Sequence, residues 1–517
     1  MKDAVHNEPV LKLLFSQRAW IRFFTVVLLG VFAVYNIKFG LAAERSVQSS
    51  QEAVTSDSDF VMPPPRTAFP LKASANNRYL VDQNNLPFLM IGDSPQSLVA
   101  SLSPEDAARY MANRKKYGIN TLWVSILCLP QICRNDASTI DGIVPFLQAG
   151  DLSTPNPAYF RRVDEMINLA VTCDMAILLD PIETSGWLET LRANGPAKAF
   201  EYGEFLGSRY KTIPNIIWLH GNDFQSWRTA SDDALVQAVA RGIRSTAPNH
   251  LHTVELNYLT SGSLDDPSWV PLVDLDAAYT YRPTYAQVLT EYNRPNFKPV
   301  FMLEANYEFE ALSNTDGGST QNLRRQAYWT MLSGAAGQVY GSYFTWRLEP
   351  GWEVNLDTPG IVQLSYLKDL FLSRKWYDLI PDQDHELVVS GYDGFSGLIG
   401  KISAYAESSA WTSRLASRIR KMTGLGSIPS NNYATAARTS DNSLMIAYLP
   451  SLRTISVDLS KLPGPATARW FDPTSGEYIA AGNSLLAPSE KREFTPPGKN
   501  AAGDGDWVLI IEKTVAP

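Results

Sequence analysis

The chain has 517 residues, a formal net charge of −8 at pH 7, and 45% hydrophobic against 19% charged residues. This length exceeds that of a usual single domain, and the composition is that of a globular protein, which excludes a disordered or fibrous chain. The acidic balance argues against nucleic acid as a partner.

The first predicted element is an uncharged stretch at residues 23–37, preceded by Arg18 and Arg22. As a helix it would span about 22 Å, and extension to Ala43 would reach the ~30 Å of a bilayer core. Small residues near its end also fit a signal-peptidase site, so residues 1–43 are either a cleaved signal peptide or a retained signal anchor. Because the basic flank stays inside, both alternatives export the rest of the protein to the periplasmic or extracellular side. A retained segment would anchor it in the inner membrane.

A linker and a strand–helix alternation follow. Residues 44–75 are rich in Ser, Gln, Asp and Pro and lack apolar periodicity, which predicts a flexible linker. In residues 76–383, strands are predicted at 89–93, 119–127, 175–180, 215–220, 252–255, 275–281, 299–304 and 338–346. Helices are predicted at 104–116, 157–173, 197–211, 232–246, 285–292, 320–336 and 362–379. This order predicts an α/β fold of the (β/α)8 TIM-barrel type, because the Gly-rich phosphate loop of a doubly wound sheet does not follow the first strand.

Carboxylates collect where the predicted strands end. Asp223 follows the fourth strand and Glu304 ends the seventh, and Asp93, Asp180 and Glu255 end others. Glycoside hydrolysis needs one protonated and one ionised carboxyl group, and functional side chains of a parallel barrel lie at this rim. Asp223 and Glu304 are therefore predicted as the catalytic pair of a glycosidase. Taken singly, either residue would more often cap a helix or pair with an arginine, and the crowd of acids could instead bind a divalent cation.

Substrate-binding residues are expected around this pair. Trp346 is favoured as a platform for a sugar ring because the predicted eighth strand ends there. His220 would orient a carboxylate or satisfy a backbone carbonyl. The other candidates at strand ends or at the rim are Asp93, Trp123, Asp180, Tyr281 and Tyr307.

No cofactor and no metal site are predicted, because the three cysteines and five histidines lack zinc-ligand spacing. Cys128 and Cys133 flank a predicted loop and could pair in an exported protein, which would leave Cys173 over.

The period of the pattern changes in residues 384–517. Short strands at 444–449, 454–459, 468–471, 477–481 and 507–511 are separated by Pro, Gly and Asn. They predict a small antiparallel β-sandwich as an accessory domain. Residues 408–427 form a basic insertion to which no function is assigned.

Several stretches together resemble a known family, namely residues 87–94, 217–223, 298–308, 324–329, 341–343 and 351–352. From residue 76 onward the chain is similar to the apiosidase-like glycoside hydrolases, glycoside hydrolase family 140 and its relatives, with a collagen-binding-type β-domain at the C-terminus. The resemblance implies that Asp223 is the acid/base and Glu304 the nucleophile. Asn222 stands where family members tend to have glycine, and it is similar to an Asn that grips a sugar hydroxyl in larger groups of retaining barrels. This departure bears on apiose specificity and not on the mechanism.

The predicted function is therefore that of an exported glycoside hydrolase. It would cleave an O-glycosidic bond in a polysaccharide or oligosaccharide side chain by a two-carboxylate, retaining mechanism, with the carboxyl groups about 5–5.5 Å apart. The alternative is a non-catalytic carbohydrate-binding or cell-envelope structural protein on a hydrolase fold, because a fold alone does not fix a function.

Overall fold

The computed structural model describes residues 66–130, 132–134, 136–224, 228–257, 260–310, 316–392, 428–482, 485–488 and 491–514. The predicted signal or anchor segment, most of the predicted linker and the basic insertion lie outside these residues. Among the described helices, none is long and apolar enough to cross a membrane.

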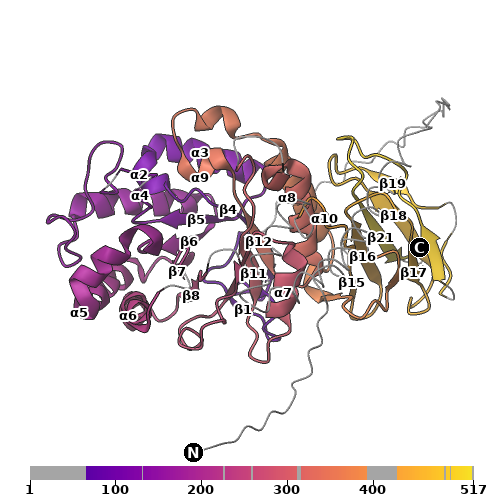
Figure 1. Ribbon diagram of the computed structural model, residues 1–517, viewed down its shortest axis with the longest axis horizontal. Coiled ribbons are helices and arrows are strands. Elements are labelled where there is room, and N and C mark those ends of the chain that lie inside the picture. Colours follow the sequence, from indigo (N-terminus) through magenta and orange to yellow (C-terminus); the bar gives the residue numbers. More distant parts are fainter. Residues whose placement is uncertain are drawn as a thin grey trace, which may run out of the picture. The chain divides into compact units, whose positions relative to one another are not determined.

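The described residues contain eight parallel strands that follow one another around a TIM-like barrel (Figure 1). They are β4 (Met90–Asp93), β5 (Thr121–Ser125), β6 (Ala176–Asp180), β7 (Ile216–His220), β8 (Leu251–Val254), β10 (Asp276–Thr280), β11 (Val300–Glu304) and β12 (Gly337–Tyr340). The first of these, β4, pairs in parallel with both β5 and the last, β12. Between β8 and β10, the short strand β9 (Thr260–Ser261) pairs antiparallel with β10. The predicted fold class is confirmed.

Helices alternate with these strands, and local chemistry explains their starts. The Ser103 hydroxyl accepts the Asp106 N–H at the start of α3, which has Pro at its first position. Thr229 and Asp232 form a reciprocal capping box at the start of α6. The helices are α2 (Leu98–Ser101), α3 (Pro104–Lys116), α4 (Pro157–Thr172), α5 (Thr184–Tyr210), α6 (Ala230–Thr246), α7 (Thr284–Tyr292), α8 (Thr320–Leu332), α9 (Tyr343–Arg347) and α10 (Pro359–Leu372). Single 3-10 turns lie at Asp316–Gly318, Trp352–Asn355 and Trp376–Asp378.

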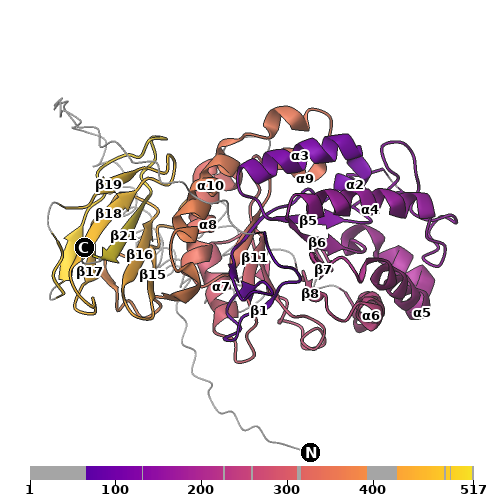
Figure 2. The same cartoon turned by 180° about the vertical axis from the view of Figure 1, so that it is seen from behind.

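Helices α5 and α6 lie side by side in both views (Figures 1 and 2). Glycines make this close approach possible, because a Cβ on Gly203 would stand 2.2 Å from the Val239 carbonyl oxygen. The prediction missed the first half of α5, which ends at a kink where Gly195 has φ 71° and Pro196 follows. A Gly-Pro pair is typical of a helix end, so the pattern indicated a break where two helical segments in fact join.

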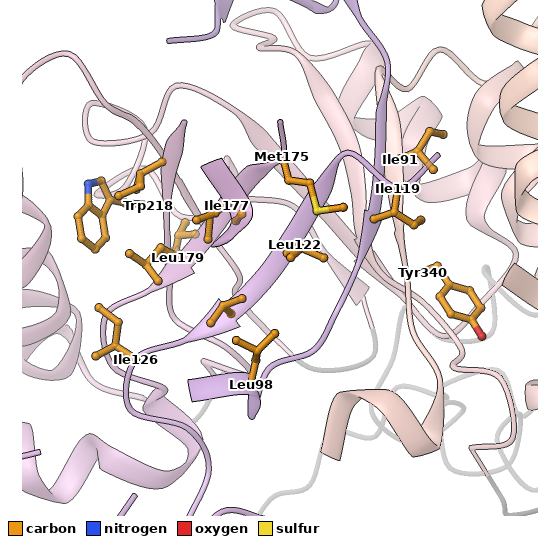
Figure 3. Packing of buried hydrophobic residues seen from close by; sticks show 14 of the residues in the cluster. Ile91, Leu98, Ile119, Leu122, Ile126, Met175, Ile177, Leu179, Trp218 and Tyr340 are labelled. Carbon is orange, nitrogen blue, oxygen red and sulfur yellow. The ribbon is translucent and has the colours of Figure 1, made fainter. Parts of the chain in front are cut away.

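Two hydrophobic clusters cover the two faces of the barrel sheet. Ile91, Leu122, Ile177, Leu179 and Trp218 project toward the helices (Figure 3). The alternate residues fill the barrel interior and include Met90, Trp123, Leu178, Ile217 and Leu219. Because both faces are buried, the strands are continuous apolar runs, which is why the sequence reveals them.

The prediction that the eighth strand runs to residue 346 is wrong. Strand β12 ends at Tyr340, and Tyr343–Arg347 forms helix α9. At the turn, Gly341 packs on the Tyr307 ring so closely that a Cβ would come within 2.6 Å of it. The backbone of Glu308 then pairs with Gly341 and Tyr343 on either side of the turn. The aromatic residues of this segment are common in strands, and the sequence therefore predicted a longer strand.

The C-terminal part forms two antiparallel sheets, as the sequence predicts. One has the order β13-β15-β16-β21-β18-β19 and the other the order β14-β17-β20. Their bounds are β13 (Leu379–Pro381), β14 (Val388–Ser390), β15 (Thr435–Thr439), β16 (Leu444–Leu449), β17 (Ile455–Asp458), β18 (Ala466–Phe471), β19 (Tyr478–Ala480), β20 (Lys491–Phe494) and β21 (Trp507–Lys513). A further small sheet consists of β1 (Lys72–Ala73), β2 (Leu80–Val81) and β3 (Pro87–Phe88).

The larger of the two C-terminal sheets is buried on both faces. Met445, Ala447 and Leu449 of β16 face the other sheet, whereas Ile446 and Tyr448 belong to the core that contains α8 and α10. Tyr448 stacks on Tyr328 of α8 at a ring-centroid distance of 4.9 Å. Arg324 of α8 donates to both carboxylate oxygens of Asp506, each at 2.8 Å. The sandwich thus continues the hydrophobic core of the barrel.

Candidate active site

A strained turn places Asp223 at the end of β7. Gly221, Asn222 and Asp223 all have positive φ, at 96°, 65° and 49°. The first position requires glycine, because a Cβ there would stand 2.1 Å from the Glu255 carbonyl oxygen. The hydroxyl of Thr184, at the start of α5, donates to the Asn222 carbonyl at 2.9 Å and fixes the other side of the turn. Left-handed non-glycine residues each cost about 1–3 kcal/mol and cluster at functional sites.

Two tyrosines connect the predicted catalytic carboxylates. The Tyr279 hydroxyl donates to Asp223 Oδ1 at 2.8 Å, and the Tyr281 hydroxyl donates to Glu304 Oε1 at 2.8 Å. The two rings come from the end of β10 and lie 5.7 Å apart between their centroids. The charge of Asp223 also acts directly on Glu304. The structure thus brings the ends of β7 and β11 together at one site.

Glu304 is oriented through both of its oxygens. In addition to Tyr281, the Tyr307 hydroxyl donates to Glu304 Oε2 at 3.2 Å, and Gln96 donates to that hydroxyl at 3.1 Å. Burial and the neighbouring charge of Asp223 raise the pKa of Glu304 to about 8, although the two tyrosine hydrogen bonds oppose this shift. Burial likewise raises the pKa of Asp223, against the hydrogen bond from Tyr279. A pair of this kind retains a proton near neutral pH.

A third carboxyl group, that of Glu255, interacts electrostatically with both. Glu255 directly follows β8, is fully buried, and accepts the Asp223 N–H through Oε2 at 3.2 Å. Burial and the charge of Glu304 raise the pKa of Glu255 well above its ordinary value. Sequence reasoning placed Glu255 at a strand end but did not select it, and it did not select Tyr279. The one feature of the sequence that could have indicated Glu255 and Tyr279 is their position at a strand end, and several other acidic and aromatic residues share that position.

The aromatic candidates lie close to Glu304. Tyr281 and Tyr307 contact its carboxylate directly. Trp346 lies in α9, with its ring edge-on to Tyr307 at a centroid distance of 6.2 Å, and it is half-buried. It therefore reaches the site through Tyr307 and from a helix, not from the end of a strand. Asn222 is buried within the strained turn beside Asp223.

Asp93 has other partners than those expected of a sugar-binding residue. Its side chain is 0% exposed, and its carboxylate accepts from the Tyr110 hydroxyl, the Arg114 guanidinium and the Ser94 N–H. Arg114 lies on α3, and its Nη1 donates to the Asn113 side chain and to the Leu356 carbonyl. These contacts favour a structural role, in which Asp93 ties β4 to α3.

His220 also has a partner that the sequence did not indicate. Its Nε2 lies 3.0 Å from His252 Nδ1, and its ring stacks on Trp269. Burial lowers the pKa of His220 to about 3 and that of His252 well below its ordinary value, so both rings are neutral. The pair supports the strand below Asp223 and contacts no carboxylate among the described hydrogen bonds.

The remaining candidates, Trp123 and Asp180, lie inside the barrel. Trp123 is 0% exposed and belongs to the interior cluster. Asp180 ends β6 and is 0% exposed, and burial together with the charge of Glu183 raises its pKa well above its ordinary value. Burial raises the pKa of Glu183 itself to about 7. Asp180 and Glu183 therefore belong to one electrostatically interacting group of acids that includes Asp223.

One disulfide lies next to this part of the barrel. Cys128 and Cys133 pair across a loop after β5, with their Cα atoms 6.3 Å apart, and Cys173 is a free thiol. Trp187 of α5 donates its indole N–H to the Cys128 carbonyl at 2.9 Å. In the described part of the chain, no group of three or more His, Cys, Asp and Glu has the arrangement of a metal site.

Two protein-family models match the sequence. The model for "Apiosidase-like, catalytic domain" matches residues 74–378, which is more than half of the chain. The model described as "Putative collagen-binding domain of a collagenase" matches residues 425–512. The sequence has no match among curated proteins.

Solved structures share the fold. A protein titled "Glycoside hydrolase" has a TM-score of 0.69 at 22% identity, covering 86% of this chain and 97% of its own. A glycoside hydrolase family 5 protein from Bacteroides vulgatus ATCC 8482 has a TM-score of 0.68 at 23% identity, covering 86% of this chain and 93% of its own. At these identities the likeness shows the fold, and it extends over both the barrel and the C-terminal sheets.

Proposed function

Since the chain belongs to the apiosidase-like catalytic domain family and is a glycoside hydrolase, we propose that it cleaves an O-glycosidic bond in a polysaccharide or oligosaccharide side chain with retention of configuration. Asp223 is the acid/base and Glu304 the nucleophile. The observation that carries this proposal is the pair of carboxyl groups at the ends of β7 and β11, of which Glu304 is buried and Asp223 is half-buried. Each is held by a tyrosine of the β10 end, and each has a raised pKa.

The reaction needs two steps. In the first, the carboxylate of Glu304 attacks the anomeric carbon while the carboxylic acid of Asp223 gives its proton to the departing oxygen. This forms a glycosyl ester on Glu304 and releases the first alcohol. In the second step, the carboxylate of Asp223 takes a proton from water, whose oxygen displaces Glu304 and releases the sugar. Retention requires the two carboxyl groups to be about 5–5.5 Å apart, which we expect for Asp223 and Glu304.

The electrostatics support this change of role. The negative charge of Glu304 favours the protonated form of Asp223 in the free enzyme, because like charges at short range disfavour double ionisation. Formation of the ester removes that charge. The pKa of Asp223 then falls, and the same group becomes a base for the second step.

We further propose that the enzyme is exported and acts on the periplasmic or extracellular side. The Cys128–Cys133 disulfide supports this, because disulfides persist mainly in oxidising compartments. The basic and apolar residues 18–43 would direct the export, and a retained segment would anchor the enzyme in the inner membrane. For the C-terminal sheets we propose a supporting role, because one face of the larger sheet continues the barrel core through Tyr448, and Asp506 accepts from Arg324 of α8.

The test is incubation of the full chain with a panel of plant and bacterial oligosaccharides, followed by analysis of the released sugar. Release by the natural protein and loss of release in Asp223→Ala and Glu304→Ala support the proposal. Binding without release across the panel would favour a non-catalytic carbohydrate-binding protein. Loss of activity on chelation would favour metal-dependent hydrolysis.

A further inference from the structure

We propose that Glu255 is a positioning residue that acts in its neutral form. It fixes the turn that carries Asp223, and it keeps a third negative charge out of the active site. This inference rests on the proposed roles of Asp223 and Glu304 and assigns a role to the carboxyl group that interacts electrostatically with both.

Glu255 holds the turn at both of its ends. Its backbone N–H donates to the His220 carbonyl at 2.8 Å, at the last residue of β7. Its side-chain Oε2 accepts the Asp223 N–H at 3.2 Å, at the third residue of the turn. Between these contacts, its carbonyl oxygen lies so close to Gly221 that a Cβ would stand 2.1 Å away. The Glu255 side chain thus supplies the backbone anchor of Asp223, while Tyr279 supplies the side-chain anchor.

The anchor matters because the turn is strained. Asn222 and Asp223 both occupy the left-handed region, which non-glycine residues leave unless other contacts hold them there. Loss of the acceptor would leave the half-buried Asp223 N–H without this partner, which is unfavourable. The turn could relieve that cost by rotating, and rotation would carry the Asp223 carboxyl group away from the departing oxygen.

The surroundings of Glu255 favour its neutral form. Its side chain is fully buried, and the strongest electrostatic influences on it come from three carboxylates, two at strand ends and one on the turn after β7. These carboxylates are Glu304, Asp223 and Asp180, and Glu255 in turn acts on the Tyr279 and Tyr307 hydroxyls. The buried Glu291 differs, since the Arg294 guanidinium contacts it. Burial and the three carboxylates raise the pKa of Glu255 well above its ordinary value, which favours the protonated form of the group.

The proton has a defined place on this group. Because Oε2 accepts a backbone N–H, the proton belongs on Oε1, which has no hydrogen-bond partner among the described residues. A glutamine side chain has the same shape, with an acceptor oxygen and a donor amide. Glutamine is therefore the closest uncharged copy of neutral Glu255, and methionine copies its length without the acceptor.

The experiment compares Glu255→Gln with Glu255→Met in the full chain, each checked for thermal unfolding. The substrates are the oligosaccharide cleaved in the panel and the 2,4-dinitrophenyl glycoside of the same sugar, whose leaving group needs no proton. We expect Glu255→Gln to lower kcat/KM by no more than about fivefold on both substrates. We expect Glu255→Met to lower it about 100-fold on the oligosaccharide and no more than about fivefold on the dinitrophenyl glycoside, because acid catalysis contributes about 10²–10⁴-fold.

The pH profile gives an independent readout that a merely structural role would not move. If Glu255 is neutral, Glu255→Gln leaves the alkaline limb of kcat/KM within about half a pH unit of the natural protein. If Glu255 is ionised, removal of its charge lowers the pKa of Asp223 and moves that limb down by about one unit or more.

The proposal is overturned if Glu255→Gln is as inactive as Glu255→Met, if Glu255→Met affects both substrates equally, or if the alkaline limb falls as described. Glu304→Ala and Asp223→Ala separate this failure from failure of the proposed function. If both are inactive while Glu255→Met is not, only the role of Glu255 is wrong. If either keeps near-normal turnover, the catalytic assignment itself fails.

Discussion

Asp93 and Glu304 occupy equivalent places in the barrel and have opposite surroundings. Each is the last residue of a parallel strand and each is buried. Asp93 forms a buried ion pair with Arg114. Glu304 has two tyrosine hydroxyls and the carboxyl groups of Asp223 and Glu255 around it. The partner, and not the strand-end position, therefore decides whether such a carboxylate stabilises the fold through an ion pair or has its pKa raised within a group of acids.

The largest effect is expected from removal of the proposed catalytic carboxyl groups. We expect Glu304→Ala to lower kcat by at least about 10⁴-fold, because the nucleophile has no substitute, while circular dichroism and the unfolding temperature stay close to those of the natural protein. Asp223→Ala should lose about 10²–10⁴-fold on the oligosaccharide. The matched control is Glu201→Gln, an exposed position on α5, which should keep full activity. Near-normal turnover in either site variant would remove that residue from the mechanism.

Loss of the Asp93–Arg114 ion pair should lower the stability of the fold and leave turnover nearly unchanged. Arg114→Met leaves Asp93 as an unpaired charge in a buried place, which costs about 3–5 kcal/mol. Chemical denaturation should show this loss, and the double variant Asp93→Asn with Arg114→Met should recover part of it. Turnover per folded molecule should change by less than about tenfold. A far larger loss in molecules that remain folded would place Asp93 in the substrate site after all.

Whereas Arg114→Met should destabilise the fold, removal of the Glu304 charge should stabilise it. The pKa of Glu304 is about 8 in the folded protein, against an ordinary value of 4.5. The folded state therefore binds this proton more tightly than the unfolded state, and ionisation of Glu304 destabilises the fold as pH rises from about 4.5 to about 8. Glu304→Gln should match the natural protein below pH ~4.5 and exceed its free energy of unfolding by a few kcal/mol above pH ~8. Urea titrations at several pH values test this, and an advantage that shrinks with rising pH would contradict it.

The smallest expected effect comes from the tyrosine that contacts Glu304. The hydrogen bond from Tyr281 lowers the pKa of Glu304, so Tyr281→Phe should raise that pKa further. Because the nucleophile must be ionised, the acid limb of kcat/KM should move up by about 0.5–1 pH unit, with a loss of roughly tenfold at neutral pH. A shift of the acid limb to lower pH would show that Tyr281 does not stabilise the carboxylate.

Much of the fold follows from local signals in the sequence. The strands are apolar runs because both sheet faces are buried, and the starts of α3 and α6 follow from capping side chains. The errors arise where a local signal has two meanings. Gly195-Pro196 marks a kink and not a helix start, and the aromatics after Tyr340 continue as α9 and not as a strand.

The sequence could predict only which side chains lie at the ends of the strands. These positions indicated Asp223 and Glu304, but they could not distinguish the two from Asp93, because the Arg114 partner of Asp93 lies 21 residues away on a helix. The sequence could not reveal that Glu255 accepts the Asp223 N–H or that the Tyr279 hydroxyl donates to the Asp223 carboxylate, since these contacts span 32 and 56 residues. Charge pairing and hydrogen bonding between distant elements are set by packing, not by spacing.

The central claim is that Glu304, a buried carboxylate that no cation contacts within the described part of the chain, is the group that bonds to the sugar. Its most direct test is incubation of the full chain with the 2-deoxy-2-fluoro glycoside of the released sugar, followed by mass spectrometry of the digested protein. We predict a covalent label on Glu304 that accumulates as activity is lost and is absent from Glu304→Gln. A label on Asp223 or Glu255, or release of a product with inverted configuration and no label, would contradict the account.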